Sequence, residues 1–349
     1  MSLPNKMSGV VLTGHGGPEK LEWRDDLPVP ALLGKQDVLI QVAAAGVNNT
    51  DVNTRIAWYS KGNAAAEDAS WSGIPMSFPR IQGADVCGRI IAVGIGVDNA
   101  RIGQRVIVEP CLREANDKRL TPPWYLGSEC DGGFAQYTRV ASRHAHTIHS
   151  DMTDVELASF PCSYSTAENM LTRAAVVRGE TVLITGASGG VGSATVQLAR
   201  ARGAKVIAVT GPQKAESLIA LGAYKTLNRN DDYLAELGAN SVDVVIDLVA
   251  GEKWASLLEL LRRGGRYAVA GAVAGPMVEL DVRTLYLKDL SLLGCTVLDP
   301  KVFGNLIKRI ENKEIKPLVA KSFPLRDIVA AQLAFLDKNY IGKIVLEVD

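Results

Sequence analysis

The chain has 349 residues, of which 47% are hydrophobic and 22% charged, so it is long enough for two domains with ordinary globular cores. Its formal net charge of zero gives no reason to expect a nucleic acid or an anionic membrane surface as a partner. The longest apolar stretch, 267–278, is too short and too rich in glycine to span a bilayer. The scattered cysteines, without a C-x-x-C pair, and the lack of a secretory signal lead us to expect a protein of the reducing cytoplasm.

The first part of the chain, up to about residue 162, has the pattern of a β-rich domain. Short apolar runs over 37–44, 86–93 and 104–108 are separated by Gly, Pro and Asn turns. Further on, His144 and His146 alternate in a way that would place both on one face of a strand. Two such imidazoles can bind a metal, but no acid or thiol partner is evident, so we interpret them as residues of an exposed strand.

From residue 163 to 310 the pattern changes to alternating strands and helices, which is typical of a parallel, doubly wound sheet. Strands are expected at 181–184, 205–209, 242–248, 266–270 and 290–297, with helices at 191–202, 213–221 and 252–261. The pair Gly264-Gly265 predicts a turn before the strand 266–270. After a further helix over 324–337, the closing strand 342–348 is expected to return to the sheet of the first domain.

The most informative segment is a glycine-rich loop between the strand 181–184 and the helix that follows it. Glycines let the backbone approach an anion, and the N–H groups and positive dipole at the start of a helix bind that anion. A tight turn without a ligand is the alternative, but the flanking strand and helix favour a dinucleotide site. The residues assigned to this site are Gly186, Ser188, Gly189, Gly190, Val191 and Gly192.

The end of the next strand favours NADPH over NADH. An NAD-specific fold places Asp or Glu there, about twenty residues beyond the glycine loop, to bind the adenosine ribose. This sequence has Thr210 instead, which leaves room for a 2′-phosphate that Lys214 could neutralise with help from Arg229. The alternative is that Lys214 is a solvated lysine at the start of a helix. Two later strand ends are expected near the nicotinamide, at Val249, Ala250, Gly271 and Ala272.

Several motifs occur in a characteristic order along the chain. They are Gly46–Asp51, Gly83–Gly88, Gly103–Val106, Asp131–Tyr137, Gly186–Gly192 and Gly342–Leu346. With these motifs the chain resembles the medium-chain dehydrogenase/reductase superfamily over essentially its whole length. The resemblance implies an α/β protein with a GroES-like β-rich catalytic domain, formed by residues 1–162 and 311–349, and a Rossmann doubly wound parallel-sheet cofactor domain at 163–310. It further implies a substrate cleft between them and a homodimer joined along 290–297, with contacts from 277–287.

The residues that would hold a catalytic zinc in the alcohol dehydrogenases of this superfamily are missing. Matching their motifs puts Asn48 where the first Cys belongs and Ala84 where the His belongs, and only Cys162 keeps a thiol. A catalytic zinc needs three protein ligands, so we expect no metal. The four-cysteine structural zinc lobe is also absent from 109–129, where Cys111 is the only thiol.

The chain therefore resembles the zinc-independent quinone oxidoreductase, or zeta-crystallin-like, branch, which carries an asparagine at the position of Asn48. Without a Lewis acid, the substrate should be a good hydride acceptor, such as a quinone or a conjugated alkene or carbonyl. Asn48 is the candidate for hydrogen bonding to a substrate carbonyl or to the cofactor ribose, although a turn-forming role stays open. Tyr59 is the candidate proton donor, Thr166 resembles the family threonine near the nicotinamide, and Asp51 is expected to be structural.

Two other functions stay open at this point: a zinc-type alcohol dehydrogenase, and an NADPH-binding protein with little turnover. The segment 58–79 is longer than the resemblance leads one to expect, and it contains Trp58, Tyr59, Trp71 and Phe78. It can be an aromatic lid over the substrate or a packed surface excursion, and the sequence does not choose between them.

Overall fold

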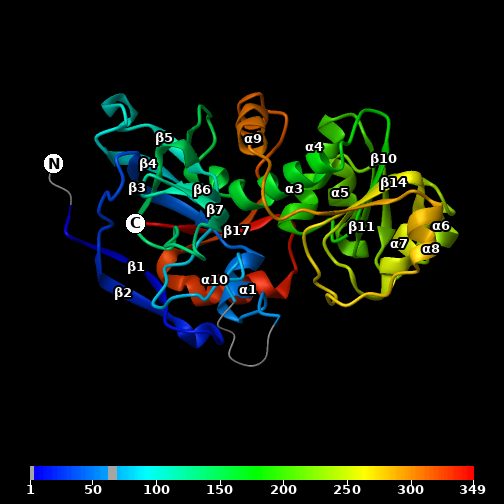
Figure 1. The fold of residues 1–349 in the computed structure, drawn as a ribbon, viewed down its shortest axis with the longest axis horizontal. Coiled ribbons are helices and arrows are strands. Elements are labelled where there is room, and N and C mark those ends of the chain that lie inside the picture. Colours follow the sequence, from blue (N-terminus) through cyan, green and yellow to red (C-terminus); the bar gives the residue numbers. More distant parts are fainter. Residues whose placement is uncertain (1–3, 62–68) are drawn as a thin grey trace. The chain divides into compact units, whose positions relative to one another are not determined.

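The computed structural model describes residues 4–61 and 69–349, which form two compact units (Figure 1). The first unit extends to Cys162 and also contains 317–339 and 343–349, and the second comprises 163–316 with 340–342. The chain thus leaves the second unit at Lys316, later than the predicted position 311. The reason is that the Lys316 backbone N–H donates to Gln197 Oε1 at 2.8 Å, which holds this segment against the second unit.

The first unit is built around a seven-stranded sheet in the order β16-β17-β3-β4-β5-β9, with β8 also paired to β3. Two separate hairpins, β1-β2 and β6-β7, complete its strands. The bounds are β1 (Lys6–Leu12), β2 (Leu21–Pro28), β3 (Asp37–Gly46), β4 (Cys87–Val93), β5 (Arg105–Val108), β6 (Cys111–Ala115), β7 (Lys118–Tyr125), β8 (Tyr137–Ala141), β9 (Ala145–Thr147), β16 (Val319–Pro324) and β17 (Lys343–Glu347). Its helices are α1 (Asn49–Arg55), α2 (Asp154–Leu157) and α10 (Ile328–Asp337).

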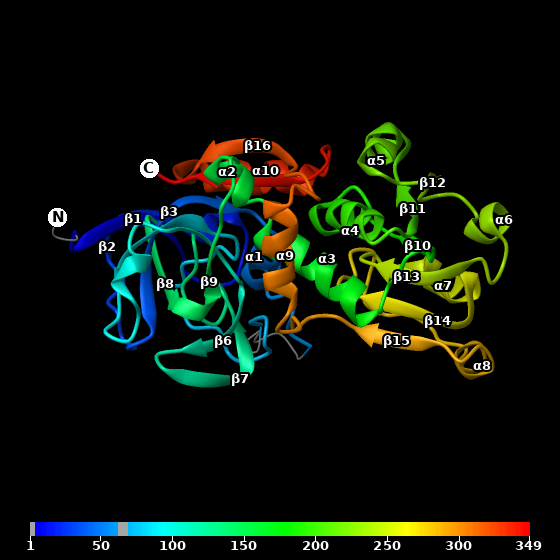
Figure 2. The same cartoon turned by 90° about the horizontal axis from the view of Figure 1, so that it is seen from above.

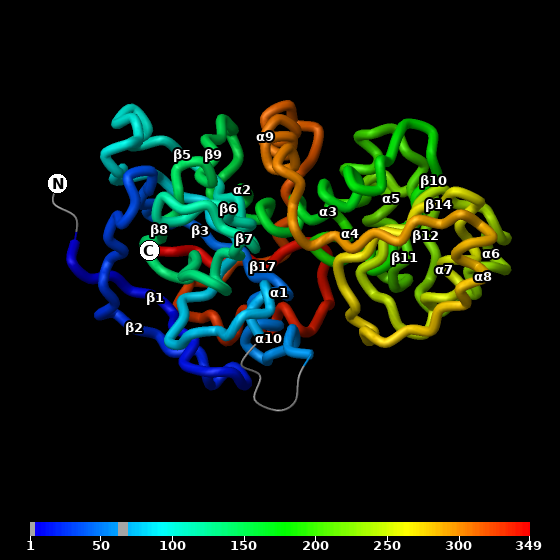
Figure 3. Tube along the Cα trace, in the orientation of Figure 1, coloured from blue at the N-terminus to red at the C-terminus, as the bar shows by residue number. Residues whose placement is uncertain are grey.

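The closing strand joins the two ends of the chain within the first unit. Strand β17 pairs antiparallel with β3, with Val345 opposite Gly46, as the red and blue segments side by side in Figure 3 show. The predicted return of the last strand to the first sheet is therefore confirmed. The predicted helix over 324–337 begins later, at Ile328, because residues 319–324 form β16 alongside β17 and Leu325–Asp327 form a 3-10 turn.

The second unit contains a six-stranded parallel sheet in the order β12-β11-β10-β13-β14-β15, which confirms the predicted doubly wound topology. Helix α4 contacts β10, β11 and α5, whereas α7 contacts β14, α6 and α8 (Figure 2). The strands are β10 (Thr181–Ile184), β11 (Lys205–Thr210), β12 (Lys225–Asn228), β13 (Val242–Asp247), β14 (Leu261–Val269) and β15 (Ser291–Gly294). The helices are α3 (Pro161–Arg173), which starts at the boundary of the units, α4 (Gly190–Ala201), α5 (Ala215–Leu221), α6 (Tyr233–Leu237), α7 (Trp254–Leu260), α8 (Val282–Leu287) and α9 (Val302–Glu311).

The turn predicted at Gly264-Gly265 lies inside a strand instead. Strand β14 begins directly after α7, because Leu261 is fully buried and already pairs with Val242. The ladder then shifts register before Arg266 pairs with Val244, and Gly264, at a φ of +71°, lies in this irregular stretch. The glycines thus permit a bulge in the strand rather than a separate connection.

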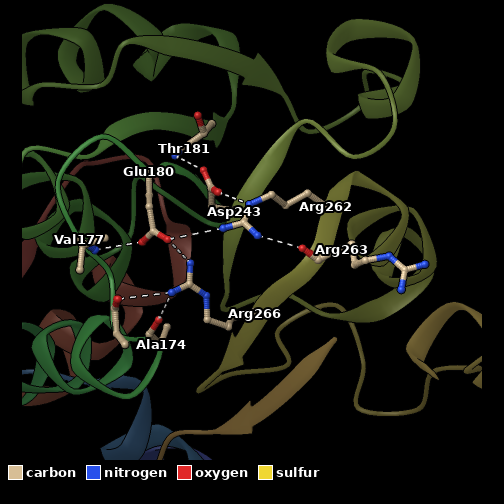
Figure 4. A network of polar contacts seen from close by, with 9 residues as sticks. Ala174, Val177, Glu180, Thr181, Asp243, Arg262, Arg263 and Arg266 are labelled. Atoms are coloured by element: carbon tan, nitrogen blue, oxygen red, sulfur yellow. Dashed lines mark hydrogen bonds and ion pairs between the residues drawn. The ribbon is translucent and has the colours of Figure 1, made fainter. Parts of the chain in front are cut away.

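A network of ionic side chains connects the segments at which strands β10 and β13 begin (Figure 4). Asp243 accepts from the Thr181 backbone N–H at 2.7 Å and from Arg262 Nε at 2.5 Å. Arg266 pairs with Glu180 and donates to the Ala174 carbonyl at 3.0 Å. These contacts stabilise the sheet at the end opposite the carboxyl ends of its strands, where ligands bind in such folds.

From the sequence we expect no stretch suited to span a membrane, and the helices of the structure can be compared with that expectation. Within residues 4–61 and 69–349, no helix has both the length and the apolar character needed to cross a bilayer.

Candidate active site

The glycine-rich loop forms a tight cradle at the start of α4 in the second unit. Gly186 has a φ of +57°, a backbone conformation that side chains other than glycine rarely adopt. A Cβ on Gly192 would lie only 2.2 Å from the Gly186 carbonyl oxygen, so no side chain fits at that position. Gly189 is the N-cap residue of α4, and the amides of the first helical turn have no partner within the helix. The loop therefore fits the phosphates of a dinucleotide.

The predicted residues at the ends of β13 and β14 lie close to this loop. A Cβ on Gly186 would be 3.2 Å from Val249 Cγ2, and one on Gly271 would be 2.9 Å from the Leu248 carbonyl oxygen. Ala250 has a φ of +55°, a strained conformation for alanine. Ala272 follows Gly271 and is half-buried. The structure thus brings the glycine loop, the 248–250 segment and Gly271 together at one edge of the sheet.

A buried carboxylate that sequence reasoning missed holds the 248–250 segment in place. Asp247 is fully buried and accepts hydrogen bonds from the Thr185 hydroxyl, from Tyr267 Oη at 2.5 Å and from the Val249 backbone N–H at 2.9 Å. The Ala250 N–H also donates to it, at 3.2 Å. These four donors compensate the cost of burying the charge. The only sequence signal for this role was an aspartate at the end of a predicted strand. The signal was weak because the hydrogen-bond partners of Asp247 lie on three separate segments of the sequence.

The end of β11 has the features expected around a 2′-phosphate. Thr210 is buried, and its Oγ1 has no hydrogen-bond partner within the described part of the chain. Burial, and the charge of Arg229, lower the pKa of Lys214, so the two cations lie near one another. Arg229 also reaches Gly211, where its Nη2 is 3.5 Å from the position that a Cβ would take. Two cations and a buried hydroxyl therefore gather at this strand end, where an NAD-specific fold has a carboxylate.

In the first unit, Asn48 lies at the centre of a buried polar cluster. Its Nδ2 donates to Asp85 Oδ2 at 2.8 Å and to the Gly46 carbonyl at 3.3 Å, and its Oδ1 accepts from Lys343 Nζ. Lys343 also forms an ion pair with Asp85, at 2.7 Å. The exposed fractions of Asn48, Asp85 and Lys343 are 5%, 0% and 2%. Lys343 comes from β17 and was part of a motif in the sequence, but its side chain was not predicted to belong to the site.

Asp51 adds a second carboxylate to this cluster. It lies in the first turn of α1, and its Oδ2 accepts from the Asn48 backbone N–H at 2.8 Å. Burial raises the pKa of the Asp51 carboxyl to about 7, and the charge of Asp85 acts in the same direction. The Lys343 ammonium opposes this shift of the Asp51 pKa. Asp51 therefore binds a proton near neutral pH, while Lys343 pairs with Asp85.

The thiol and the aromatic residues of the first unit lie against the same cluster. The Cys162 backbone N–H donates to Asp85 Oδ1 at 2.6 Å, and Tyr125 Oη donates to Cys162 Sγ at 3.0 Å. Trp71 stacks on Tyr125 with a centroid distance of 4.8 Å. Tyr59 accepts from Asn53 Nδ2 at 3.4 Å, and burial raises its pKa, with further increases from the charges of Cys162 and Asp51.

These contacts bear on the two interpretations of the segment 58–79. Trp71 is fixed to Tyr125, and the backbone N–H groups of Trp71 and Ser72 donate to Ser128 and Glu129 at 2.9 and 2.8 Å. This part of the segment is packed against the first unit. Residues 62–68 lie outside the described part of the chain.

The residues at the expected metal position do not fit a catalytic zinc. Asn48 uses its amide oxygen to accept from an ammonium, and Ala84 has no donor atom. Burial raises the pKa of the Cys162 thiol to about 12, whereas zinc binds the thiolate. The Lys343 ammonium lies where it would repel a cation. Among the described residues, no group of three or more His, Cys, Asp or Glu side chains could hold a metal ion.

The prediction that His144 and His146 belong to an exposed strand is wrong for His144. Its side chain is 1% exposed, and its Nδ1 lies 3.1 Å from Glu109 Oε2. The other ring nitrogen accepts from the Arg113 backbone N–H at 3.1 Å, which fixes the neutral tautomer. His146 Nε2 is 3.7 Å from the same carboxylate. The acid partner that seemed to be missing is Glu109, which precedes the β6-β7 hairpin.

Thr166, the third predicted catalytic residue, lies on α3 in the second unit and is half-buried. Of the remaining loop residues, Ser188, Gly190 and Val191 are also half-buried. The structure thus gathers Asn48 and Tyr59 around one cluster of the first unit, and the cofactor candidates around the sheet edge of the second.

Comparison with known proteins agrees with this architecture. The model described as alcohol dehydrogenase GroES-like domain matches residues 34–150, and the zinc-binding dehydrogenase model matches residues 190–312. A quinone oxidoreductase of Rattus norvegicus is 30% identical over 97% of this chain and 97% of its own length. The acryloyl-coenzyme A reductase of Metallosphaera sedula is 28% identical over 97% of this chain and 99% of its own.

A solved structure is similar over its whole length. A Sinorhizobium meliloti 1021 protein, provisionally described as an alcohol dehydrogenase, has 47% identity and a TM-score of 0.92, with 99% of this chain and 98% of that chain covered. A β-rich GroES-like unit joined to a Rossmann unit with a glycine cradle defines the medium-chain dehydrogenase/reductase superfamily, and the chain belongs to it. It is an oxidoreductase of that superfamily, for which a nicotinamide cofactor is implied. Within the superfamily it belongs to the quinone oxidoreductase branch, as predicted.

Proposed function

We propose that the chain is a zinc-independent reductase that uses NADPH to reduce a quinone, or an alkene or carbonyl activated by conjugation. The observation that carries this proposal is the buried Lys343 ammonium, bonded to Asp85 and to Asn48, the residue that the motif match puts at the place of a zinc cysteine. The positive charge of Lys343 beside Asn48 and Cys162 disfavours a second cation there. The acceptor must then be reactive without a Lewis acid.

The choice of NADPH rests on the end of β11. The unpartnered hydroxyl of the buried Thr210, together with Lys214 and Arg229, suits a dianionic 2′-phosphate better than a ribose hydroxyl. The nicotinamide of the bound cofactor would supply the hydride. The residues Gly186–Gly192 would hold the pyrophosphate, and Val249, Ala250, Gly271 and Ala272 would lie nearest the reactive ring.

The choice of acceptor is supported by the names of two relatives. The quinone oxidoreductase of Rattus norvegicus and the acryloyl-coenzyme A reductase of Metallosphaera sedula are named for a quinone and for a conjugated thioester. Both classes of substrate accept a hydride without a metal. The solved alcohol dehydrogenases favour the second candidate, an alcohol dehydrogenase, and NADPH binding without turnover is the third.

The hydrogen bonds of Asn48 narrow its proposed role. Both hydrogens of Nδ2 already have acceptors, whereas Oδ1 accepts from Lys343 and faces the Asp51 backbone N–H in a capping box at the start of α1. Asn48 therefore also has the turn-forming role that the sequence left open. For a contact with the cofactor we propose Oδ1, accepting from a hydroxyl such as that of the ribose, rather than Nδ2 donating to a carbonyl. Tyr59 remains our candidate for donating a proton to the reduced substrate, and Thr166 for a contact near the nicotinamide.

We also propose a homodimer formed through β15. This strand is the last in its sheet, and Leu292 on it is 38% exposed. Large exposed apolar side chains lie on or near α8, namely Met277, Val282, Tyr286 and Leu287. An edge strand beside an apolar surface suits pairing with a second copy. For its place in the cell we keep the prediction of the cytoplasm.

One assay separates the three functions. NADPH consumption is measured with quinones, enones, enoyl thioesters and aldehydes, and NADPH formation from NADP+ with alcohols, in the presence and absence of a chelator. The proposal predicts turnover with quinones or enones that the chelator does not change. Turnover of alcohols or aldehydes alone, lost with the chelator, supports an alcohol dehydrogenase. Tight NADPH binding with no turnover of any acceptor supports the binding protein.

A further inference from the structure

The buried ion pair of the first unit has a consequence for Asn48. Lys343 Nζ can only donate hydrogen bonds, and the Asp85 carboxylate can only accept them. Asn48 lies between the two, with Oδ1 on Lys343 and Nδ2 on Asp85 at 2.8 Å. Rotating the amide by 180° would place two donors face to face and two acceptors face to face. Only one orientation of the amide is therefore compatible with its neighbours.

We propose that Lys343 is a positioning residue of the reductase, and that it acts by fixing the orientation of the Asn48 amide through a buried ion pair with Asp85. This proposal rests on the proposed function for its kinetic readout. Lys343 is 2% exposed, and its ammonium is bonded to Asn48 and Asp85. Its effect on the reaction must pass through Asn48 and through the electric field of its charge.

The connectivity of the chain explains how this lysine reaches the cluster. Asn48 is the N-cap residue of α1 and lies two residues after the end of β3, and β17 pairs with that end of β3 through Val345 and Gly46. The Lys343 backbone N–H is held by the Leu318 carbonyl at 2.8 Å, which secures the start of β17. Residues 295 positions apart in the sequence are thereby brought into direct contact. The last strand thus supplies the charge that lies beside the N-cap residue of α1.

The ion pair also sets the charge balance of the cluster. With Lys343 paired to Asp85, a proton on Asp51 leaves the buried group neutral overall. The groups that face Asp51 are Asp85, Lys343, Cys162 and Tyr59, together with the backbone N–H groups of Asn48 and Gly83. Removing the ammonium would leave the Asp85 charge uncompensated and would make Asp51 harder to ionise. This provides a readout that does not depend on turnover.

The experiment compares Lys343→Met with Lys343→Arg, and uses Lys321→Met as a matched control. Lys321 is exposed on β16, the strand next to β17, so the control makes the same substitution outside the cluster. For an acceptor that the wild type reduces, Lys343→Met is expected to lower kcat by about 100-fold or more, with the Kd for NADPH changed less than about threefold. Lys343→Arg should have a kcat at least about tenfold higher than that of Lys343→Met, because a guanidinium can still donate to both Asn48 and Asp85. Lys321→Met should behave as the wild type.

A second variant addresses the case in which Lys343→Met does not fold. Breaking a buried pair by removing one partner is strongly destabilising, whereas removing both charges is tolerated far better. The double variant Lys343→Met/Asp85→Asn should therefore recover the fold but not kcat. If Lys343→Met or the double variant folds and keeps kcat within about threefold of the wild type, the proposal is overturned.

Titration of the Asp51 carboxyl by 13C NMR tests the inference independently of the proposed function. In Lys343→Met the Asp51 pKa should rise by roughly one unit or more above that of the wild type, while Lys321→Met leaves it unchanged. If the wild type reduces no acceptor but this shift is seen, the proposed function fails and the ion pair stands. An unchanged Asp51 pKa in Lys343→Met would show that Lys343 does not pair within the cluster, whatever the enzyme reduces.

Discussion

Replacing Asp51 by asparagine should change how the stability of the first unit depends on pH. In the folded protein burial raises the pKa of this carboxyl from 3.8 to about 7. The folded state therefore holds a proton that the unfolded chain releases. The stability that this proton contributes is fully present below pH 3.8 and is lost as the pH rises through 7. Asparagine keeps an oxygen that can accept from the Asn48 N–H but does not titrate.

The size of the effect follows from the two pKa values. A difference of about 3 units corresponds to about 4 kcal/mol over the whole range. Between pH 5 and pH 8 the wild type should lose about 2 to 3 kcal/mol that Asp51→Asn does not lose. For a unit of this size, that difference amounts to roughly 5 to 10 °C in Tm. Glu109, whose pKa is lowered to about 2, titrates below this window and does not disturb it.

The assay is thermal unfolding of the wild type, Asp51→Asn and Asp25→Asn at several values between pH 5 and pH 8. Asp25 is exposed on β2, so its variant makes the same substitution outside the cluster. As the pH rises, the Tm of Asp51→Asn should increase relative to that of the wild type. The difference in Tm between Asp25→Asn and the wild type should stay constant. A constant difference between Asp51→Asn and the wild type across this range would refute the assignment of a buried proton to Asp51.

Three further predictions concern the cofactor site and the acid partner of the buried histidine. Alanine at Lys214 or Arg229 should weaken NADPH binding by about 10- to 100-fold in a fluorescence titration, with NADH binding unchanged; an equal loss for both cofactors would count against a 2′-phosphate site. Gly192→Ala would place a Cβ 2.2 Å from a carbonyl oxygen of the loop, so NADPH binding should fall by at least about tenfold, and calorimetry showing normal affinity would exclude this packing. Glu109→Gln should lower the free energy of unfolding at pH 7 by about 2 to 3 kcal/mol, measured by chemical denaturation. The reason is that the Glu109 pKa is lowered to about 2, so the stability that its carboxylate contributes is present above pH 4.5 and is lost as the pH falls through 2. Unchanged stability at pH 7 would contradict the role of Glu109 beside His144.

The parts of the molecule that sequence could predict are those in which the signal is local. The strand, glycine loop and helix around Gly186 and Gly192 are contiguous, and each glycine has a steric reason that acts within the loop itself. The alternation of strands and helices likewise predicted the parallel sheet, which the order of β10 to β15 confirms. The turn predicted at Gly264-Gly265 was wrong because the start of β14 is set by the pairing of Leu261 with Val242, a contact between separate segments that local sequence patterns do not show.

The residues that were missed depend on contacts between distant segments. Lys343 precedes an apolar strand and has the sequence pattern of a solvated lysine, and only the pairing of β17 with β3 buries it against Asn48. His144 was placed in an exposed strand because its partner, Glu109, lies 35 residues away on another segment. Asp247 likewise has partners on separate strands and on its own loop. Burial of a charged group is decided by its tertiary partners, which a single sequence does not display.

The central claim, that the chain reduces its acceptor without a catalytic metal, is tested most directly by measuring zinc in the purified protein alongside its NADPH turnover. The account predicts less than about 0.1 zinc per chain and turnover of a quinone or enone that survives chelation. Near-stoichiometric zinc, with turnover lost when the metal is removed and regained when it is returned, would contradict it.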